Sequence, residues 1–572
     1  MKKFLFKIMA FAVMLGASFC LIGCGDNSFT SSVTVSQQEG EQSVLVQWDT
    51  SRALDKVEIT VTHNGELVSS KIITSSGELS RGGVDIGAFY GKHTVTTTLY
   101  SKNAKNVDSK EIKVSAKEYN IAPLSGSLPV LMFTLSSLQD DGLMKNSSGK
   151  TIPTFVWLDR SLAYDWTKLP QGFYTMPNAT VEEYTTPNVN KDLMYRKTKE
   201  YIKELISLDS SSKINLFLND YDAEKYLELI VATGLDDANY TCTYLSDGSF
   251  SYSIINSTFN VADATAKYDQ MKTNYLQAKQ QIKDKGYFNN SSEFAITGNI
   301  QEYLLVIANE DDNVEWWFPR LRSGHINLTN DTTNLKNTKI FQADGTTKQP
   351  SLKEYGLGTF LTNIEKDAEK SQTLKELYKF NDDMFAQAKE QNKKVMMLLG
   401  TKAKNDLESN FEDYTNFVKS LYGDEYVYYY KGHPDTPTYL YPERAQKLEQ
   451  MGLIDIESTI NAELILFYFP DIYMSGYSSS TFNAITNDDM ACVYWGTTKA
   501  NALAKTDVKG GGFNAYITPA TSAYDSIVTS GHRNYLVEFT DTTNYDFAIY
   551  DATEDKTTYY KQDGSDFTVV NK

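Results

Sequence analysis

Two short segments in the C-terminal half of the chain carry side chains that could bind a nucleotide. The first reads K-G-H-P over residues 431–434 and follows the apolar, tyrosine-rich run 425–430. The second begins at Glu463 and passes through an apolar stretch to the hydroxyl cluster 478–480. Carboxylates accept hydrogen bonds from ribose hydroxyls, and serine hydroxyls at a helix N-terminus can hold a phosphate. The two segments therefore favour a ribose-phosphate ligand.

These side chains need elements that bring them to one place. We predict a strand and then a loop for the first segment, and a helix, a loop and a second helix for the second. In an open α/β sheet, ligands bind at the carboxyl ends of the strands, where such loops lie.

The ordered set of motifs resembles a known family. The set comprises K-G-H-P, then N-A-E-L-I-L at 461–466 and G-Y-S-S-S-T-F at 476–482, with Y-L-S-D-G-S-F-S-Y at 244–252 upstream. Across residues 125–500 the order and spacing resemble the bacterial GT-B sialyltransferases, which depend on CMP-sialic acid and carry an HP motif and an SS motif. Each motif alone is unspecific, and the resemblance depends on the ordered set.

The resemblance implies roles for residues of the second half. His433 would lie at the leaving phosphate as an acid or hydrogen-bond donor, Lys431 would add positive charge, and Glu463 would bind the ribose. The other implied donor-binding residues are Gly400, Thr401, Gly432, Pro434, Ser479 and Ser480, with Ser478 and Ser479 as the alternative pair if the alignment shifts by one. Judged alone, His433 could be a turn residue before proline, and Glu463 an ordinary helix carboxylate.

The general base is where this chain departs from the family. In the family, the first acid of a D-D-G element takes the proton, but here Ser246 holds that position, and a serine is no base near neutral pH. Asp247 is therefore the predicted base, with Asp220 and Asp222 as other candidates unless the alignment slips by one. Asn219 is predicted to contact the acceptor.

The resemblance thus implies an inverting transferase that moves sialic acid, or a related ulosonic acid, from its CMP donor to a terminal galactoside, without a metal ion or other cofactor. Two alternatives stay open. One is a glycan-binding surface lipoprotein on a catalytically impaired GT-B fold, which Ser246 and export would explain. The other is the substrate-binding lipoprotein of a transporter, against which the ordered motifs argue.

The N-terminus predicts an exported, lipid-anchored protein. Lysines precede the apolar run 8–19, which is too short to span a bilayer, and residues 21–24 read L-I-G-C, a lipobox. We predict a signal peptide at 1–23 and a lipid on Cys24 that binds the membrane. Removing 1–23 takes away three lysines and no acid, so the formal charge goes from −18 to −21. Such a surface repels nucleic acid, which we exclude as a partner.

The patterns predict several domains. Residues 24–32 are a tether, and 33–118 alternate apolar and polar residues between turn signals, which predicts an antiparallel, immunoglobulin-like β-sandwich. A linker at 119–126 leads to alternating strands and helices, which predict a GT-B fold of two Rossmann-like domains. The predicted ranges are 126–258 for the acceptor domain, 259–535 for the CMP-donor domain and 536–572 for a C-terminal tail without an assigned role.

Within these domains, the apolar runs 128–135 and 152–158 are predicted as buried strands, and 365–391 as one amphipathic helix. Cys242 and Cys492 are single and far apart, so we predict small buried residues rather than a metal site or a disulfide.

Overall fold

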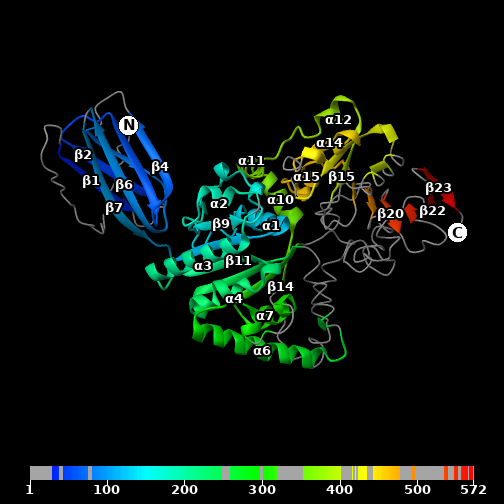
Figure 1. Cartoon of the computed structure of the whole chain (residues 1–572), viewed down its shortest axis with the longest axis horizontal. Coiled ribbons are helices and arrows are strands. Elements are labelled where there is room, and N and C mark those ends of the chain that lie inside the picture. The colour runs from blue at the N-terminus through cyan, green and yellow to red at the C-terminus, as the bar shows by residue number, and fades with distance from the viewer. Residues whose placement is uncertain are drawn as a thin grey trace.

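The computed structural model of the chain describes most of residues 29–319 and 352–476, with short gaps, and five strands between 492 and 570. Figure 1 shows three parts in chain order: antiparallel sheets at the N-terminal side, then two domains in which helices cover largely parallel sheets. Among the residues described, no helix is both long and apolar enough to cross a membrane.

The N-terminal part consists of two antiparallel sheets that share a core. The first sheet has the order β1-β2-β5 and the second β4-β3-β6-β7. Their strands are β1 (Ser31–Gln37), β2 (Val44–Thr50), β3 (Lys56–His63), β4 (Glu66–Thr74), β5 (Arg81–Asp85), β6 (Gly91–Ser101) and β7 (Ala104–Val114). Alternate side chains such as Val46 and Trp48 on β2, and Val57 and Ile59 on β3, are buried, as period-two strands require. Antiparallel β-structure is confirmed here, and the immunoglobulin-like class stays a prediction.

The first α/β domain contains a seven-stranded parallel sheet in the order β10-β9-β8-β11-β12-β13-β14. Its strands are β8 (Glu118–Leu124), β9 (Thr154–Leu158), β10 (Phe173–Thr175), β11 (Lys213–Asn219), β12 (Tyr240–Leu245), β13 (Val314–Pro319) and β14 (Leu352–Tyr355). The predicted boundary between 258 and 259 is wrong, because β13 and β14 continue the first sheet: Cys242 of β12 pairs with Val314, and Trp316 with Leu352.

The start of this domain also differs from the prediction. Residues 119–126 are no linker, because β8 is an inner strand between β9 and β11. The apolar run 128–135 is not a strand but lies within α1 (Ser127–Ser137), in which every residue after Ser127 is buried. A helix that is buried on all sides is apolar on all sides, so its sequence lacks the helical period.

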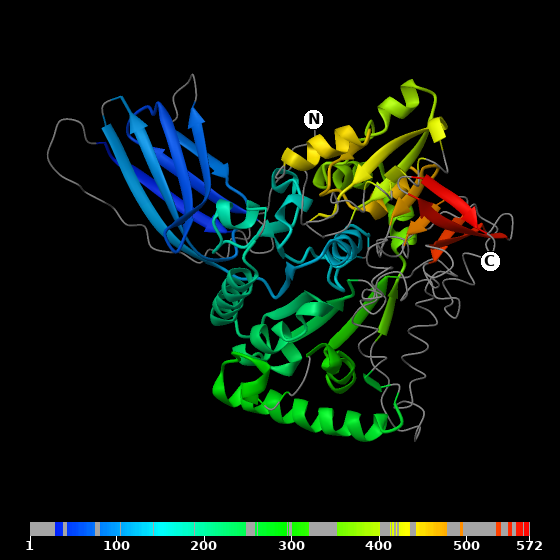
Figure 2. The ribbon, with the colours of Figure 1, turned by 45° about the vertical axis from the view of Figure 1, so that its right-hand side comes forward.

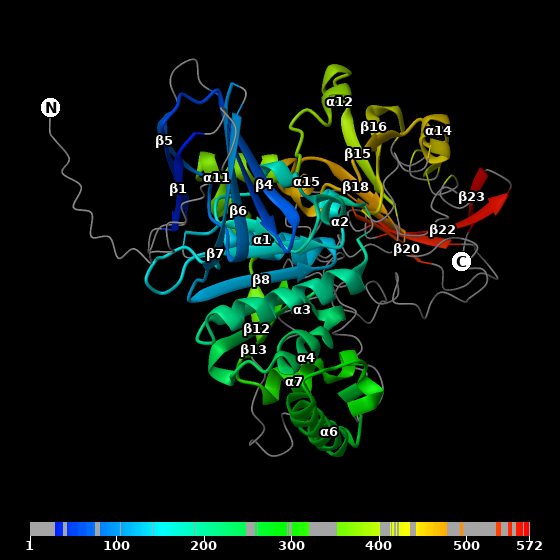
Figure 3. The ribbon, with the colours of Figure 1, turned by 60° about the vertical axis from the view of Figure 1, so that its left-hand side comes forward.

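Helices flank the first sheet. They are α2 (Val181–Thr185), α3 (Lys191–Leu208), α4 (Lys225–Leu229), α6 (Ala264–Lys285) and α7 (Leu304–Glu310). Asn190 caps α3, since its side chain accepts a hydrogen bond from the Leu193 N–H group. Figure 2 shows α6 at the far end of this domain from the second α/β domain, and Figure 3 shows α3 beside β8, on which it packs.

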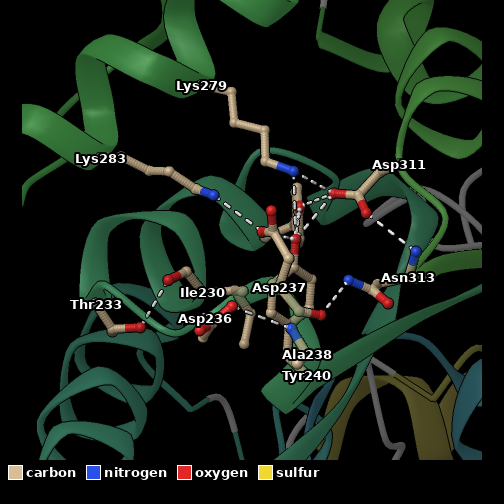
Figure 4. A network of polar contacts seen from close by, with 11 residues as sticks. Ile230, Thr233, Asp236, Asp237, Ala238, Tyr240, Lys279, Lys283, Asp311 and Asn313 are labelled. Carbon is tan, nitrogen blue, oxygen red and sulfur yellow. Dashed lines mark hydrogen bonds and ion pairs between the residues drawn. The ribbon is translucent and has the colours of Figure 1, made fainter.

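A buried polar network lies between α6 and the amino end of this sheet (Figure 4). Lys279 of α6 donates to Asp311 at 2.7 Å, and the Tyr226 hydroxyl donates to the same carboxylate. Burial raises the pKa of Asp311, but the charge of Lys279 and the hydrogen bonds outweigh it, so the pKa lies below its usual value. A second, more exposed pair joins Lys283 to Asp237 at 2.9 Å.

The second α/β domain contains a nine-stranded sheet in the order β17-β16-β15-β18-β19-β20-β21-β22-β23, parallel as far as β20. Its strands are β15 (Lys394–Leu399), β16 (Tyr426–Lys431), β17 (Ile454–Ile456), β18 (Tyr473–Gly476), β19 (Cys492–Trp495), β20 (Asn534–Glu538), β21 (Phe547–Asp551), β22 (Lys556–Asp563) and β23 (Asp566–Val570). The predicted tail 536–572 therefore supplies antiparallel strands to this sheet, and a domain end at 535 would cut β20.

The helices between β14 and β18 are α10 (Leu357–Glu365), α11 (Ala368–Leu377), α12 (Ala386–Glu390), α14 (Pro442–Gln450) and α15 (Ala462–Tyr468). Of these, α10 and α11 share a core with α1 of the first domain. The single helix predicted over 365–391 is wrong: α11 ends at Leu377, and Lys379 adopts a left-handed backbone with φ 52°, which ends an α-helix. Glu463 lies in helix α15, as predicted, and the loop predicted to follow contains strand β18, while the second helix, predicted to begin at the hydroxyl cluster 478–480, lies outside the described residues.

The two parallel sheets share one topology. Numbered from the first strand of each, β8 and β15, both follow the order 3-2-1-4-5-6, which is that of doubly wound nucleotide-binding folds. In such a sheet, the connections leave in opposite directions on either side of strand 1, and the crevice at its carboxyl end binds ligands. The topology thus predicts a ligand-binding site at the carboxyl ends of β8 and β15.

Candidate active site

A cavity of about 180 Å³ lies at the carboxyl ends of strands from both α/β domains. The first domain contributes the β8–α1 turn and the ends of β9 and β12, and the second contributes the ends of β15 and β16 and the start of α15. The lining residues are Ser127, Leu128, Arg160, Asp247, Leu399, Gly400, Lys431, Gly432, His433, Pro434, Asn461, Ala462 and Glu463. Seven of these lining residues had roles predicted from the sequence, namely Asp247, Gly400, Lys431, Gly432, His433, Pro434 and Glu463. Asn219, which also had a predicted role, is buried next to Asp247.

Lys431 ends β16 and holds the loop that carries His433. Its side chain is 3% exposed, and its amine donates to the carbonyl oxygens of Gly432 at 2.9 Å and Ser458 at 2.7 Å. Burial lowers the pKa of Lys431 to about 8, although the Glu463 carboxylate works in the opposite direction. Because two of its three donors serve backbone carbonyls, Lys431 positions the loop as well as adding charge.

Gly432 allows the K-G-H-P loop to pack closely. A Cβ atom here would lie 2.9 Å from Ser458 Oγ and 3.0 Å from a ring carbon of Tyr430. His433 and Pro434 follow, half-buried, at the cavity wall. Glu463 lies in the first turn of α15, where the helix dipole favours a negative side chain.

Asp247 comes from the opposite wall, two residues beyond β12. Asn219 Nδ2 donates to the Ser125 carbonyl at 2.8 Å and lies 3.5 Å from Asp247 Oδ2. Burial raises the pKa of Asp247, and the positive charge of Arg160 partly opposes this shift. Asn219 is 2% exposed and does not line the cavity, so the structure gives it contact with the predicted base, and its acceptor contact stays a prediction.

The other two candidate bases do not line the cavity. Asp222 accepts from the Ser125 hydroxyl and pairs with Lys191 at 3.4 Å. Asp220 is 1% exposed and lies beneath the Ser246–Asp247 turn. Among the three acids, Asp247 is the one that faces the space in which a substrate could lie.

Gly126 lets the β8–α1 turn approach Asp247. It has φ +80°, and a Cβ atom would lie 2.5 Å from Asp247 Oδ2 and 2.9 Å from Asn219 Nδ2. Any larger residue must displace the carboxylate that we predict to be the base.

We expect Gly126→Ala to lower the proposed transfer rate by about 10²-fold, because misplacement of a reacting group by about 1 Å has effects of that size. The matched control is Gly149→Ala, since Gly149 has a similar φ of +73° but nothing within 4 Å of the added atom. Steady-state rates of both variants would test this prediction. A Gly126→Ala variant with the wild-type rate would show that this glycine is not needed to place the Asp247 carboxylate.

No role was predicted for six of the lining residues, namely Ser127, Leu128, Arg160, Leu399, Asn461 and Ala462. Arg160 follows β9 and donates to Ser127 Oγ at 2.7 Å. Asn461, which precedes α15, donates from Nδ2 to the Ser127 carbonyl at 3.0 Å, a hydrogen bond between the two domains. Arg160 belongs to no recognisable motif, and Asn461 was noted only as the first residue of N-A-E-L-I-L, so that only the fold shows that both contact Ser127.

Several predicted positions lie outside the described residues, namely Thr401, Ser478, Ser479, Ser480 and the lipidation site Cys24. Within the part of the chain that the structure describes, Cys242 is buried and has a free thiol, and no cluster of three or more His, Cys, Asp or Glu residues could hold a metal ion.

Comparisons with known proteins give distant structural similarities only. No family model and no curated protein matches the chain. A sialyltransferase from Photobacterium damsela has a TM-score of 0.45 at 13% identity, over 80% of this chain and 92% of that chain. A UDP-GlcNAc 2-epimerase from Neisseria meningitidis, bound to UDP-GlcNAc, has a TM-score of 0.33 at 7% identity, over 72% and 86%. A Medicago truncatula protein complexed with UDP-glucose has 0.36 at 13%, over 69% and 84%. At these values the function has to be inferred from the site itself.

Proposed function

We propose that the protein is a glycosyltransferase of the GT-B type that takes sialic acid, or a related ulosonic acid, from its CMP donor and transfers it to a terminal galactoside. One observation carries the proposal: a single cavity collects Asp247 from the first α/β domain and Lys431, Gly432, His433 and Glu463 from the second. Two substrates that react with each other must be bound on opposite sides of one cavity. Here one side carries the acid Asp247, and the other carries the loop 431–434, which we propose binds the donor phosphate.

The chemistry divides between the two walls. Asp247 takes the proton of the acceptor hydroxyl as that oxygen attacks the anomeric carbon. The bond from this carbon to the CMP phosphate oxygen breaks, and the electron pair leaves with CMP. His433 donates a hydrogen bond or a proton to the departing phosphate. Attack and departure on opposite faces invert the anomeric carbon.

The donor half of the proposal rests on the second domain. Gly400 and the loop 431–434 follow the adjacent parallel strands β15 and β16, and Glu463 lies where a ribose hydroxyl could donate to it. CMP, rather than another nucleotide, and the galactoside acceptor are proposed from the motif resemblance, as are the phosphate contacts of Ser479 and Ser480, the contacts of Thr401, and independence from metal ions.

The location is proposed from the N-terminus. Export by a signal peptide at 1–23 and lipidation of Cys24 would anchor the protein to a membrane. Membrane fractionation of the full chain beside Cys24→Ser would check this.

His433→Ala is expected to lower lactose-dependent CMP release from CMP-sialic acid by about 10²–10³-fold, because the leaving phosphate loses a donor. The full chain in detergent serves as the enzyme. His433→Gln is the matched variant, since its amide donates a hydrogen bond but no proton. Recovery in His433→Gln would assign His433 to hydrogen bonding, and loss in both variants would assign it to acid catalysis.

Two results would count against the proposal. CMP binding with no turnover, together with glycan binding, would favour the glycan-binding lipoprotein on an impaired GT-B fold. Absence of both CMP binding and turnover would exclude the donor class itself.

A further inference from the structure

Asp220 is a buried carboxyl group directly behind the proposed base. It follows β11, which lies beside β12 in parallel register, so that Asn219 pairs with Leu245 and Asp220 comes next to Ser246. Asp220 Oδ1 accepts from the Asp247 N–H group at 3.3 Å, and Oδ2 accepts from the Trp316 indole N–H group at 3.3 Å. The side chain is 1% exposed.

The charges around Asp220 come from the elements that pack against it. Asp247, at the end of β12, is negative when ionised, and Trp316 of β13 and Ser246 are neutral. The cations Arg160 and Lys191 act on Asp247 rather than on Asp220. Asp222, from the same short turn, is paired with Lys191. Asp220 therefore has neutral donors and a carboxylate as its neighbours.

This environment disfavours a negative charge on Asp220. Burial, and next the charge of Asp247, raise the pKa of Asp220 to about 7. Neutral N–H donors do not balance a full charge in a dry site, and two adjacent carboxyl groups resist losing both protons. Below about pH 7 the proton thus remains on Asp220, and Asp247, which faces the cavity and whose burial-raised pKa is brought down by Arg160 and Lys191, is the acid of the pair that gives up its proton more readily.

We propose that Asp220 acts as an uncharged carboxylic acid that positions the base: it holds the Asp247 main chain at the cavity, and its neutral form leaves Asp247 as the negative group of the pair. The proposal rests on the proposed function, since it names the residue that positions the base of that reaction. Asp220 is a positioning residue and not a catalytic one, because it does not line the cavity.

The first test needs no substrate. A carboxyl group with a raised pKa binds a proton in the folded state that the unfolded chain releases, so stability falls as pH rises from the ordinary value of 3.8 to about 7 and is then constant. The Asp220→Asn variant has no carboxyl group at this position, so its stability does not fall with pH for this reason. The melting temperature of Asp220→Asn minus that of the wild type should therefore increase between those pH values and level off above them. The control is Asp263→Asn, which makes the same substitution at an exposed acid before α6.

The second test is transfer activity below about pH 7, where Asp220 keeps its proton. Asn is neutral and retains an oxygen that can accept from the Asp247 N–H group, so Asp220→Asn should keep transfer within about threefold of wild type. Asp220→Ala removes that acceptor and should lose about 10²-fold, as misplaced reacting groups do. Calorimetry with CMP should find unchanged affinity in both variants.

The results separate the two proposals. A melting difference that does not depend on pH would overturn the neutral state of Asp220 whether or not the protein has transferase activity. Equal loss of transfer in Asp220→Asn and Asp220→Ala would overturn it too, since a charged Asp220 would then be required. A wild-type protein that neither binds CMP nor turns over donor would refute the proposed function alone.

Discussion

Asp247→Asn should lower lactose-dependent transfer from CMP-sialic acid by about 10²–10⁴-fold, the range over which a general base contributes. Asn has nearly the same shape, so the contacts with Asn219 and the β8–α1 turn can persist while the proton acceptor is lost. CMP affinity should change little, because the residues proposed to bind the nucleotide belong to the second domain. Rates with and without lactose, beside calorimetry with CMP, provide the measurement.

The control for that prediction is Asp263→Asn, which changes an exposed acid before α6, far from the cavity. Full transfer by Asp247→Asn would contradict Asp247 as the base. Combined with loss in Asp220→Asn, it would assign proton transfer to Asp220 instead, and the two acids would exchange roles.

Lys279→Met should destabilise the fold by about 3–5 kcal/mol, the usual effect of removing one partner of a buried ion pair. Asp311 is 3% exposed and Lys279 is 16% exposed in this pair, so the substitution leaves a buried carboxylate with only hydroxyl and amide partners. Urea unfolding followed by far-ultraviolet circular dichroism measures the change.

Lys283→Met is the matched control on the same helix, one turn further along. Its partner Asp237 is 57% exposed, and such surface pairs contribute about 0–1 kcal/mol. Equal unfolding midpoints for Lys279→Met and the wild type would mean that the tyrosine hydroxyls and the Asn313 N–H group stabilise the Asp311 carboxylate without Lys279.

The sequence was sufficient to predict most strand ends that form the site. Two of the strands are apolar runs that stop at polar residues: β16 ends at the K-G-H-P loop, and β12 ends just before Ser246 and Asp247. Parallel strands that end together bring such residues together, so the cavity could be anticipated from local patterns. The two-sheet α/β architecture followed from the same alternation of strands and helices.

The errors have physical causes. The run Leu128–Leu135 has no polar face because α1 is buried throughout, and a short apolar run does not separate helix from strand. β8 contains Pro123, which argues against an inner strand. Pairing of β8 with β11, however, extends only as far as Ile121, and Pro123 pairs with β9 alone.

Other features depend on contacts between distant residues. Arg160 and the N–H acceptor Asp220 belong to no motif, and Asn461 was noted only as the first residue of N-A-E-L-I-L. The contacts of all three involve partners such as Ser127 and Trp316 that only the fold brings close. The domain boundary failed for a similar reason, because the sheet position of β13 is fixed by pairing with β12 and not by its own sequence.

The junction between the N-terminal sheets and the first α/β domain has a mechanical consequence. Only residues 115–117 separate β7 from β8, and Tyr201 and Glu204 of α3 hydrogen-bond to the backbone of Tyr90 and Lys92. The N-terminal sheets cannot swing freely on such a short, clamped hinge. If Cys24 carries the proposed lipid, a force on the N-terminal sheets would reach the first α/β domain through β8 and α3, and β8 leads directly into the turn at Gly126 that contacts the Asp247 carboxylate.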